Sequence, residues 1–123
     1  MDDNFEFRVM ITRQLERLGC QVKATANASE FLGELYSAQR PFDLAVIDVR
    51  LPGLNGDEIV SWMHESEDEA HRAMPIFFVT GFPNQALQEI ATQNSKVKVL
   101  KKPLSYQDLK EEILSIGPRQ RVH

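Results

Sequence analysis

Side chains of three complementary kinds follow three short apolar runs in the sequence. Asp48 follows LAVI, Thr80 follows IFFV, and the adjacent pair Lys101 and Lys102 follows VKVL. A carboxylate can act as a nucleophile, while a hydroxyl group and an ammonium group can bind the oxygens of an anionic group. Each residue alone has an ordinary explanation, as a helix cap, a turn residue or a solvated charge. Their joint placement after three successive runs favours a shared reactive site.

The apolar runs that carry these residues are typical of strands buried on both faces of a parallel sheet, because they do not alternate with polar residues. Helical periodicity separates them, as in the first helix, where Phe7, Ile11 and Leu15 lie on one stripe. The strands are expected at residues 20–25, 44–47, 76–79 and 97–100, and the helices at 4–18, around 31–35, around 59–63, at 84–94 and at 106–116. This alternation predicts a doubly wound α/β fold, in which functional residues gather at the carboxyl ends of the strands.

Length and composition limit the class of protein. The chain has 123 residues, enough for one domain, and a net charge of -4, which gives no broad basic surface for nucleic acid. Cys20 is the only cysteine, so an internal disulfide and a multi-cysteine metal site are excluded. No apolar run reaches the roughly 18 residues that cross a bilayer, and the acidic start is unlike a signal peptide. We expect a reduced, cytoplasmic domain over residues 1–117 that contacts no membrane, followed by a basic tail over residues 118–123.

Three segments together resemble the receiver domain of response regulators: DLAVIDVRLPGLNGDEI, IFFVTG and VKVLKKPL. At the start, MDDNFEFRVMITRQLERLGCQV is similar to the family's acidic pair and first helix, so the match covers nearly the whole chain. The resemblance implies a flavodoxin-like doubly wound parallel sheet, here with four sequence-encoded strands and five helices. It also implies that Asp48 is the phosphoacceptor and that Asp2 and Asp3 form the acidic pair. Thr80 and Lys102 take the family's hydroxyl and lysine positions.

A magnesium ion is the cofactor that this resemblance implies. When brought together, Asp2, Asp3 and Asp48 would repel one another and raise each other's proton affinity, and a hard divalent cation relieves that repulsion. By resemblance, Asp3 and Asp48 ligate Mg²⁺ directly, together with the backbone carbonyl of Arg50. Asp2 acts through water.

Phosphoryl transfer requires an in-line nucleophile and neutralised phosphoryl oxygens, with little other covalent help. The resemblance implies that Mg²⁺ and Lys102 balance charge and that Thr80 donates a hydrogen bond. The backbone amides of Val49 and Gly81 bind the remaining oxygens, and Gly81 has no side chain to block the donor. The Lys102–Pro103 peptide bond is expected to be cis, which would aim the lysine into the site.

Two departures from the family pattern affect how this chain would signal. Val99 occupies the position of the family's switch aromatic, so the usual coupling through an inward-turning ring cannot operate in that form. The apolar strand that normally precedes the acidic pair is also missing, because Asp2 follows Met1 directly. Five buried apolar residues would contribute about 10 kcal/mol, which is comparable to the stability of a whole domain.

Three arrangements would close the gap that the missing strand leaves. Residues upstream of Met1 could supply the strand, a neighbouring chain could supply it, or a four-stranded sheet could form with a weakened Mg²⁺ site. We expect an atypical receiver that forms homo-oligomers, with strand exchange as one route.

The expected partner is a histidine kinase or a histidine phosphotransfer domain, which would dock at Phe5 and Val9 on the first helix. The alternative is a pseudo-receiver, an interaction or dimerisation module with impaired phosphorylation. An aspartyl phosphatase is disfavoured, because such enzymes use a second acid two residues after the nucleophile, where this chain has Arg50. No glycine-rich nucleotide motif occurs either. We therefore expect no enzyme activity beyond self-catalysed phosphoryl transfer to Asp48 and hydrolysis from it.

Overall fold

The computed structural model describes residues 1–2, 4–37, 42–48, 65, 69, 74–81, 85–116 and 121–122. Its helices with described bounds are α1 (Phe5–Arg17), α2 (Ala28–Ser37), α5 (Gln85–Gln93) and α6 (Tyr106–Leu114). Its strands are β1 (Gln21–Val22), β2 (Ala45–Asp48), β3 (Ile76–Thr80), β4 (Val97–Lys101) and β5 (Arg121–Val122). The helix expected around residues 59–63 lies outside the described residues, and the other expected helices and strands are confirmed within a few residues. Among these four helices, none has the length and apolar character needed to span a membrane.

The strands form one layer in which every described pairing is parallel. β2, β3 and β4 pair in that order, with Phe78 of β3 opposite Ile47 on one side and Val99 on the other. β1 pairs with β5, and a bridge between Leu44 and Val122 joins β5 to the start of β2. The spatial order is therefore β1-β5-β2-β3-β4, which confirms the predicted doubly wound α/β fold.

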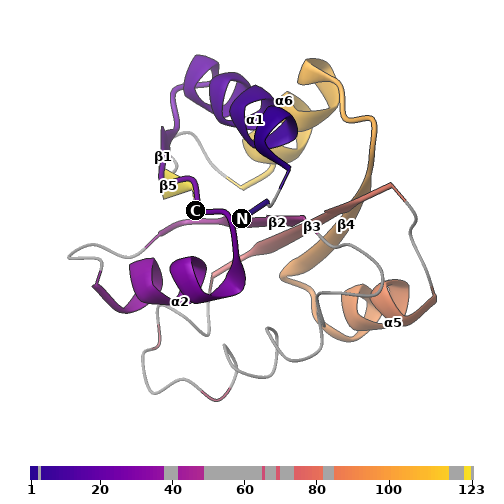
Figure 1. Ribbon diagram of the computed structural model, residues 1–123. Helices are drawn as coiled ribbons and strands as arrows, with labels where there is room; N and C mark the ends of the chain where they lie inside the picture. Colours follow the sequence, from indigo (N-terminus) through magenta and orange to yellow (C-terminus); the bar gives the residue numbers. More distant parts are fainter. Residues whose placement is uncertain are drawn as a thin grey trace.

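Helices cover both faces of the sheet, with α1 and α6 on one face and α2 and α5 on the other (Figure 1). Neighbouring residues of β3 point to opposite faces, so they enter two different apolar cores. Phe78 packs in the cluster that includes Phe31 of α2, and Phe77 packs in the cluster that includes Leu109 of α6. All residues of β3 are buried. The apolar run without alternation is thus a strand covered on both faces, as predicted.

Helix α1 begins directly after the acidic start of the chain. Asn4 is its N-cap, and the side-chain oxygen of Asn4 accepts a hydrogen bond from the Phe7 amide at 3.0 Å. Ile11 and Leu15 are the buried residues of this helix, on the stripe that the sequence predicts. Because the helix starts so soon after Asp2, its packing against the sheet also holds the acidic end of the chain.

Strand β5 was not predicted, and it lies in the middle of the sheet, where the family pattern places its missing strand. Arg121 and Val122 fall in the segment that we expected to be a basic tail, but they lie between β1 and the start of β2. Val122 is completely buried. A segment from the end of this same chain therefore supplies part of the pairing.

Met1 and Asp2 lie between the same two neighbouring segments as β5, closer to the carboxyl edge of the sheet. The Met1 ammonium group donates to the Val46 carbonyl oxygen at 2.6 Å, and the Asp48 amide donates to the Met1 carbonyl oxygen at 2.8 Å. On the other side, the Asp2 amide donates to the Thr25 carbonyl oxygen at 3.0 Å. The middle of the sheet is thus built from both ends of the chain, which lie close together in Figure 1.

Replacing either aromatic residue of β3 tests the arrangement with two cores. Phe77→Ala and Phe78→Ala should each lower the free energy of unfolding by about 3–5 kcal/mol, because each leaves a cavity in a separate buried cluster. As a control, Phe5→Ala removes the same ring from a side chain that is 67% exposed, and should cost less than about 1 kcal/mol. Urea unfolding measures all three values. A loss for Phe77→Ala no larger than that for Phe5→Ala would contradict the arrangement.

Candidate functional site

Three of the predicted site residues meet at the carboxyl edge of the sheet. Asp48 ends β2, Thr80 ends β3, and Lys102 follows the last residue of β4. Asp48 and Thr80 are buried, with 6% and 2% of their surfaces exposed. The Lys102 amide donates to the Thr80 carbonyl oxygen at 2.8 Å. The three residues reach one edge because the strands that carry them run in the same direction.

The Lys102 ammonium group links two buried carboxylates. Its Nζ lies 2.7 Å from Asp48 Oδ1 and 3.6 Å from Asp2 Oδ2. Both carboxylates are nearly excluded from water, so the lysine offsets a repulsion that solvent would screen only weakly. Of the two adjacent lysines in the sequence, Lys102 belongs to the site, whereas Lys101 is exposed.

Two residues in the first turns of α1 complete this cluster, and neither was predicted as a site residue. The Lys102 Nζ lies 3.8 Å from the centre of the Phe7 ring, which is a cation–π contact. Arg8 donates from Nη1 to the Asp2 carbonyl oxygen at 2.7 Å. Their position directly after the acidic pair is the signal that could have identified them, because the first turn of a helix lies beside the residues that precede it.

Asp2 carries a buried oxygen atom that lacks a hydrogen bond. Its Oδ1 accepts from the Asn4 amide at 2.8 Å, whereas Oδ2 accepts no hydrogen bond from any described residue. Burial raises the pKa of Asp2 above its ordinary value, the Asn4 hydrogen bond opposes this shift, and the Asp48 carboxylate adds to it. This carboxylate is therefore costly to ionise in the absence of a further cation.

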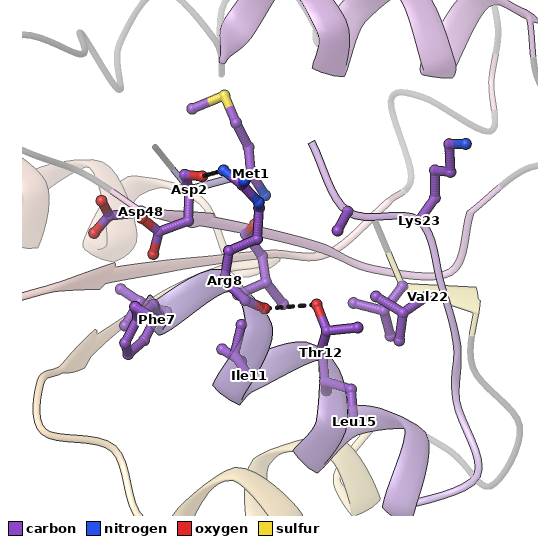
Figure 2. A pocket seen from close by; sticks show the side chains of 14 residues that line it. Met1, Asp2, Phe7, Arg8, Ile11, Thr12, Leu15, Val22, Lys23 and Asp48 are labelled. Atoms are coloured by element: carbon purple, nitrogen blue, oxygen red, sulfur yellow. Dashed lines mark hydrogen bonds between the residues drawn. The ribbon is translucent and has the colours of Figure 1, made fainter. Parts of the chain in front are cut away.

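The N-terminal amino group is a second basic group beside these carboxylates. Figure 2 shows Met1, Asp2 and Asp48 lining one end of a single pocket. Burial lowers the pKa of the Met1 amino group from 8.0 to about 6, and the two carboxylates oppose that shift. In the sequence, Met1 is simply the first residue, and no motif indicates that its amino group is buried.

The donor set at this edge fits a hard divalent cation such as Mg²⁺. Asp2 and Asp48 bring carboxylate oxygens together, and Asp2 Oδ2 is buried without a hydrogen bond. Asp3 and the Arg50 carbonyl, predicted as further ligands, lie outside the described residues, as does the Val49 amide. Among the residues that are described, no group of three or more His, Cys, Asp and Glu side chains could hold a metal. The structure thus shows two carboxylates of the predicted ligand set.

Two other predicted features of the site are visible. The Lys102–Pro103 peptide bond is cis, as predicted. Gly81 is half-buried, and a Cβ atom added there would meet no atom within 4 Å, so the space beside the end of β3 is open.

The residues predicted to act in switching and in docking differ in how much of their surface is buried. Val99 is partly buried and packs against the core cluster on the α2 and α5 face. Phe5 is 67% exposed at the start of α1, whereas Val9 is half-buried. Their roles in signalling and docking stay predictions.

Known proteins resemble this chain over almost its whole length. A family model described as the response regulator receiver domain matches residues 1–114. The response regulator receiver protein CpdR of Brucella abortus is 30% identical over 112 residues, which cover 91% of this chain and 88% of CpdR. The sensor histidine kinase GacS of Pseudomonas protegens is 29% identical over 115 residues, which cover 93% of this chain but only 12% of GacS. Among solved structures, the chemotaxis protein CheY4 of Vibrio cholerae has the same fold, with a TM-score of 0.78 at 23% identity and coverage of 94% of this chain and 92% of that chain.

The lowered pKa of the Met1 amino group predicts that stability depends on pH. Between pH 6 and 8 the unfolded chain holds a proton here that the folded chain holds less well, so the free energy of unfolding should rise with pH, by up to about 3 kcal/mol. N-terminal acetylation replaces the ammonium group by an amide and should remove this rise. Thermal unfolding of both forms across this pH range, in metal-free buffer, measures the difference.

The three histidines and the other titrating groups away from this site are the same in both forms, so their contributions cancel in the comparison. Asp2 contributes with the opposite sign at lower pH, because its raised pKa makes stability fall as the pH rises above about 4. Equal slopes for the free and acetylated chains between pH 6 and 8 would show that the amino group is not buried in solution.

Proposed function

This chain belongs to the response regulator receiver domain family of two-component signalling systems, and we propose that it accepts a phosphoryl group on Asp48. The donor is the phosphohistidine of a histidine kinase or of a histidine phosphotransfer domain. The observation that carries the proposal is the 2.7 Å contact between Lys102 Nζ and Asp48 Oδ1, at the edge where Thr80 ends the adjacent strand. This geometry brings a carboxylate nucleophile and a fixed positive charge together with a hydroxyl group.

The transfer forms a bond between a carboxylate oxygen of Asp48 and phosphorus, and it breaks the bond between phosphorus and the imidazole nitrogen of the donor. The imidazole leaves with the electron pair of the broken bond. Lys102 balances negative charge on the phosphoryl oxygens, and the Thr80 hydroxyl donates a hydrogen bond to one of them. The open space at Gly81 leaves room for the donor beside the end of β3.

Asp2 and Asp48, together with Asp3 and the Arg50 carbonyl, would hold Mg²⁺ at this edge. When bound, the ion neutralises charge on the transferred phosphoryl group. The buried Asp2 Oδ2, which lacks a hydrogen bond among the described residues, supports this assignment.

A second candidate is a pseudo-receiver that serves as an interaction module. It is favoured by Val99, which stands at the position of the family's switch aromatic and lacks an aromatic ring.

The docking surface for the donor is the exposed start of α1. Phe5 is 67% exposed there, beside the turn that carries Phe7 and Arg8 into the site. An exposed aromatic ring near the phosphoacceptor suits contact with an apolar helix of a kinase or phosphotransfer domain. The chain spans only 12% of the length of GacS, so a histidine kinase as its partner is part of this proposal.

Phosphorylation by a small donor tests the assignment of Asp48. Incubation with Mg²⁺ and acetyl phosphate should add the mass of one phosphoryl group, and Asp48→Asn should abolish the gain. Asp43→Asn makes the same change at an exposed position near the other end of β2, and it should leave the gain intact. Intact-mass spectrometry measures all three chains. A wild-type chain that binds no Mg²⁺ and gains no mass would favour the pseudo-receiver.

The two adjacent lysines offer a matched test of the charge at the site. Lys102→Gln should lower the rate of phosphorylation by about 100-fold, because it removes the cation that contacts Asp48. Lys101→Gln changes an exposed neighbour in the same way and should leave the rate within about twofold. Rates follow from the time course of the mass gain. Equal rates for the two variants would remove Lys102 from the mechanism.

A further inference from the structure

The Phe7 ring lies against the Lys102 ammonium group, at the edge of the sheet where Asp48 ends β2. The Lys102 Nζ is 3.8 Å from the centre of the ring and 2.7 Å from Asp48 Oδ1. Figure 2 shows the ring of Phe7 on α1 and the carboxylate of Asp48 on β2. One ammonium group therefore contacts an aromatic face and the proposed nucleophile at the same time.

The lysine side chain does not hold its charge at a defined point by itself. The backbone of Lys102 is fixed, because its amide donates to the Thr80 carbonyl oxygen at 2.8 Å. A flexible four-carbon stem separates this backbone from Nζ, and ordering it costs side-chain entropy. The Lys102 side chain is also 22% exposed, so water competes for its ammonium group. The groups that contact Nζ therefore decide where the charge lies.

The ion pair with Asp48 alone would place that charge on the attacking oxygen. An ammonium group bonded to the nucleophile stabilises the chain before the reaction, whereas transfer is accelerated only by contacts that strengthen in the transition state. The ring attracts the same ammonium group from α1 and shares it with Asp48. Because the ring contains no hydrogen-bond acceptor comparable to a carboxylate, the lysine keeps its donors for oxygen atoms.

Phe7 is held in place by α1 and by the core. Its amide donates to Asn4 Oδ1 at 3.0 Å, which fixes the first turn of the helix. Its side chain is half-buried and packs against the cluster that includes Ile11 and Leu15 of the same helix. The ring is thus a rigid surface for the lysine, and partial burial strengthens an attraction that water would otherwise weaken.

Packing alone explains why position 7 is apolar, but not why an aromatic face meets a cation there. Leucine would continue the apolar stripe of α1 equally well, yet it has no quadrupole to attract an ammonium group. A similar contact occurs between Arg17, in the last turn of α1, and Tyr106 of α6, where Arg17 Cζ lies 4.1 Å from the ring centre. That contact includes none of the predicted site residues, so it provides a matched comparison for Phe7.

We propose that Phe7 is a positioning residue for phosphoryl transfer, whose ring holds the Lys102 ammonium group where it meets a phosphoryl oxygen at Asp48. Its effect passes through the lysine. This inference rests on the proposed phosphorylation of Asp48, and it adds to that site a residue that the sequence resemblance does not assign.

Replacement of the ring by an alkyl group tests the role of Phe7. With Mg²⁺ and acetyl phosphate, a carboxylate oxygen of Asp48 bonds to phosphorus, and acetate leaves with the electron pair of the broken bond. Phe7→Leu keeps an apolar side chain but removes the aromatic face, and should slow the mass gain about fivefold. Phe7→Tyr keeps the face and should remain within about twofold of the unchanged chain.

Tyr106→Leu is the matched control. It removes an aromatic ring from a contact with a cation on the same face of the sheet, but that cation is Arg17. The rate of mass gain should stay within about twofold of the unchanged chain. An equal loss of rate in Phe7→Leu and Tyr106→Leu would overturn the proposal, because it would show a general effect of weakened packing between helices.

A double-mutant cycle separates positioning of the lysine from support of the fold. If the ring acts through Lys102, Phe7→Leu should slow the reaction in the unchanged chain and have no further effect in Lys102→Gln. A structural role would slow both chains by the same factor, and that result would overturn the proposal. Phe7→Met, a second apolar replacement, gives the same comparison if leucine disturbs the fold.

Proton chemical shifts of Lys102 test the contact without any phosphorylation. Protons above an aromatic face are shielded, so the ε-methylene protons of Lys102 should lie upfield of those of the exposed Lys101. The upfield shift should disappear in Phe7→Leu and persist in Phe7→Tyr. Equal shifts for Lys101 and Lys102 in the unchanged chain would overturn the proposal.

The outcomes distinguish this inference from the function on which it rests. A chain that gains mass as fast in Phe7→Leu as in the unchanged form would overturn the role of Phe7 and leave Asp48 as the phosphoacceptor. An unchanged chain that gains no mass would overturn both. Slower gain in Phe7→Leu, dependent on Lys102 and accompanied by loss of the upfield shift, is the result that we expect.

Discussion

The peptide groups of β1 and β2 that face each other across the middle of the sheet impose the constraint on which the rest of the structure depends. Backbone groups at unpaired strand edges have to bond to another segment of chain or to water. Val122 provides a carbonyl oxygen for Lys23, while Met1 provides both a donor and an acceptor for β2. The chain meets this requirement with its two ends, and the position of the acidic residues follows from that solution.

Acidic and basic groups meet at the carboxyl edge of the sheet. Two buried carboxylates, Asp2 and Asp48, face the Lys102 ammonium group, and the Met1 ammonium group lies close by. The opposed pKa shifts of Asp2 and Met1 have one cause, since burial disfavours the charged form of an acid and of a base alike.

The reactive cluster could be predicted in part because its members end apolar runs. Asp48, Thr80 and Lys102 follow buried strands, and the parallel sheet brings strand ends together whatever the details of packing. Phe7 was correctly placed on an apolar stripe, but a periodic pattern does not show that a ring in the first helical turn lies against a lysine far away in the sequence. Contacts of that kind depend on tertiary packing.

Strand β5 could not be predicted for a different reason. Arg121 and Val122 are only two residues, flanked by polar ones, and two residues carry neither alternation nor an apolar run. Their strand conformation comes from the unpaired neighbours that they meet, not from their own preference. The segment that pairs with β1 and with the start of β2 could therefore not be identified from the sequence.

The contact between Phe7 and Lys102 has a consequence for the chemistry of the site. An aromatic face attracts an ammonium group through its quadrupole, and this attraction contains no proton or formal charge that a reaction at Asp48 would remove. In the proposed acyl phosphate of Asp48, the carboxylate charge is no longer a partner for the lysine. The ring would still contact the Lys102 ammonium group, which could then turn from the carboxylate to a phosphoryl oxygen while it keeps this contact.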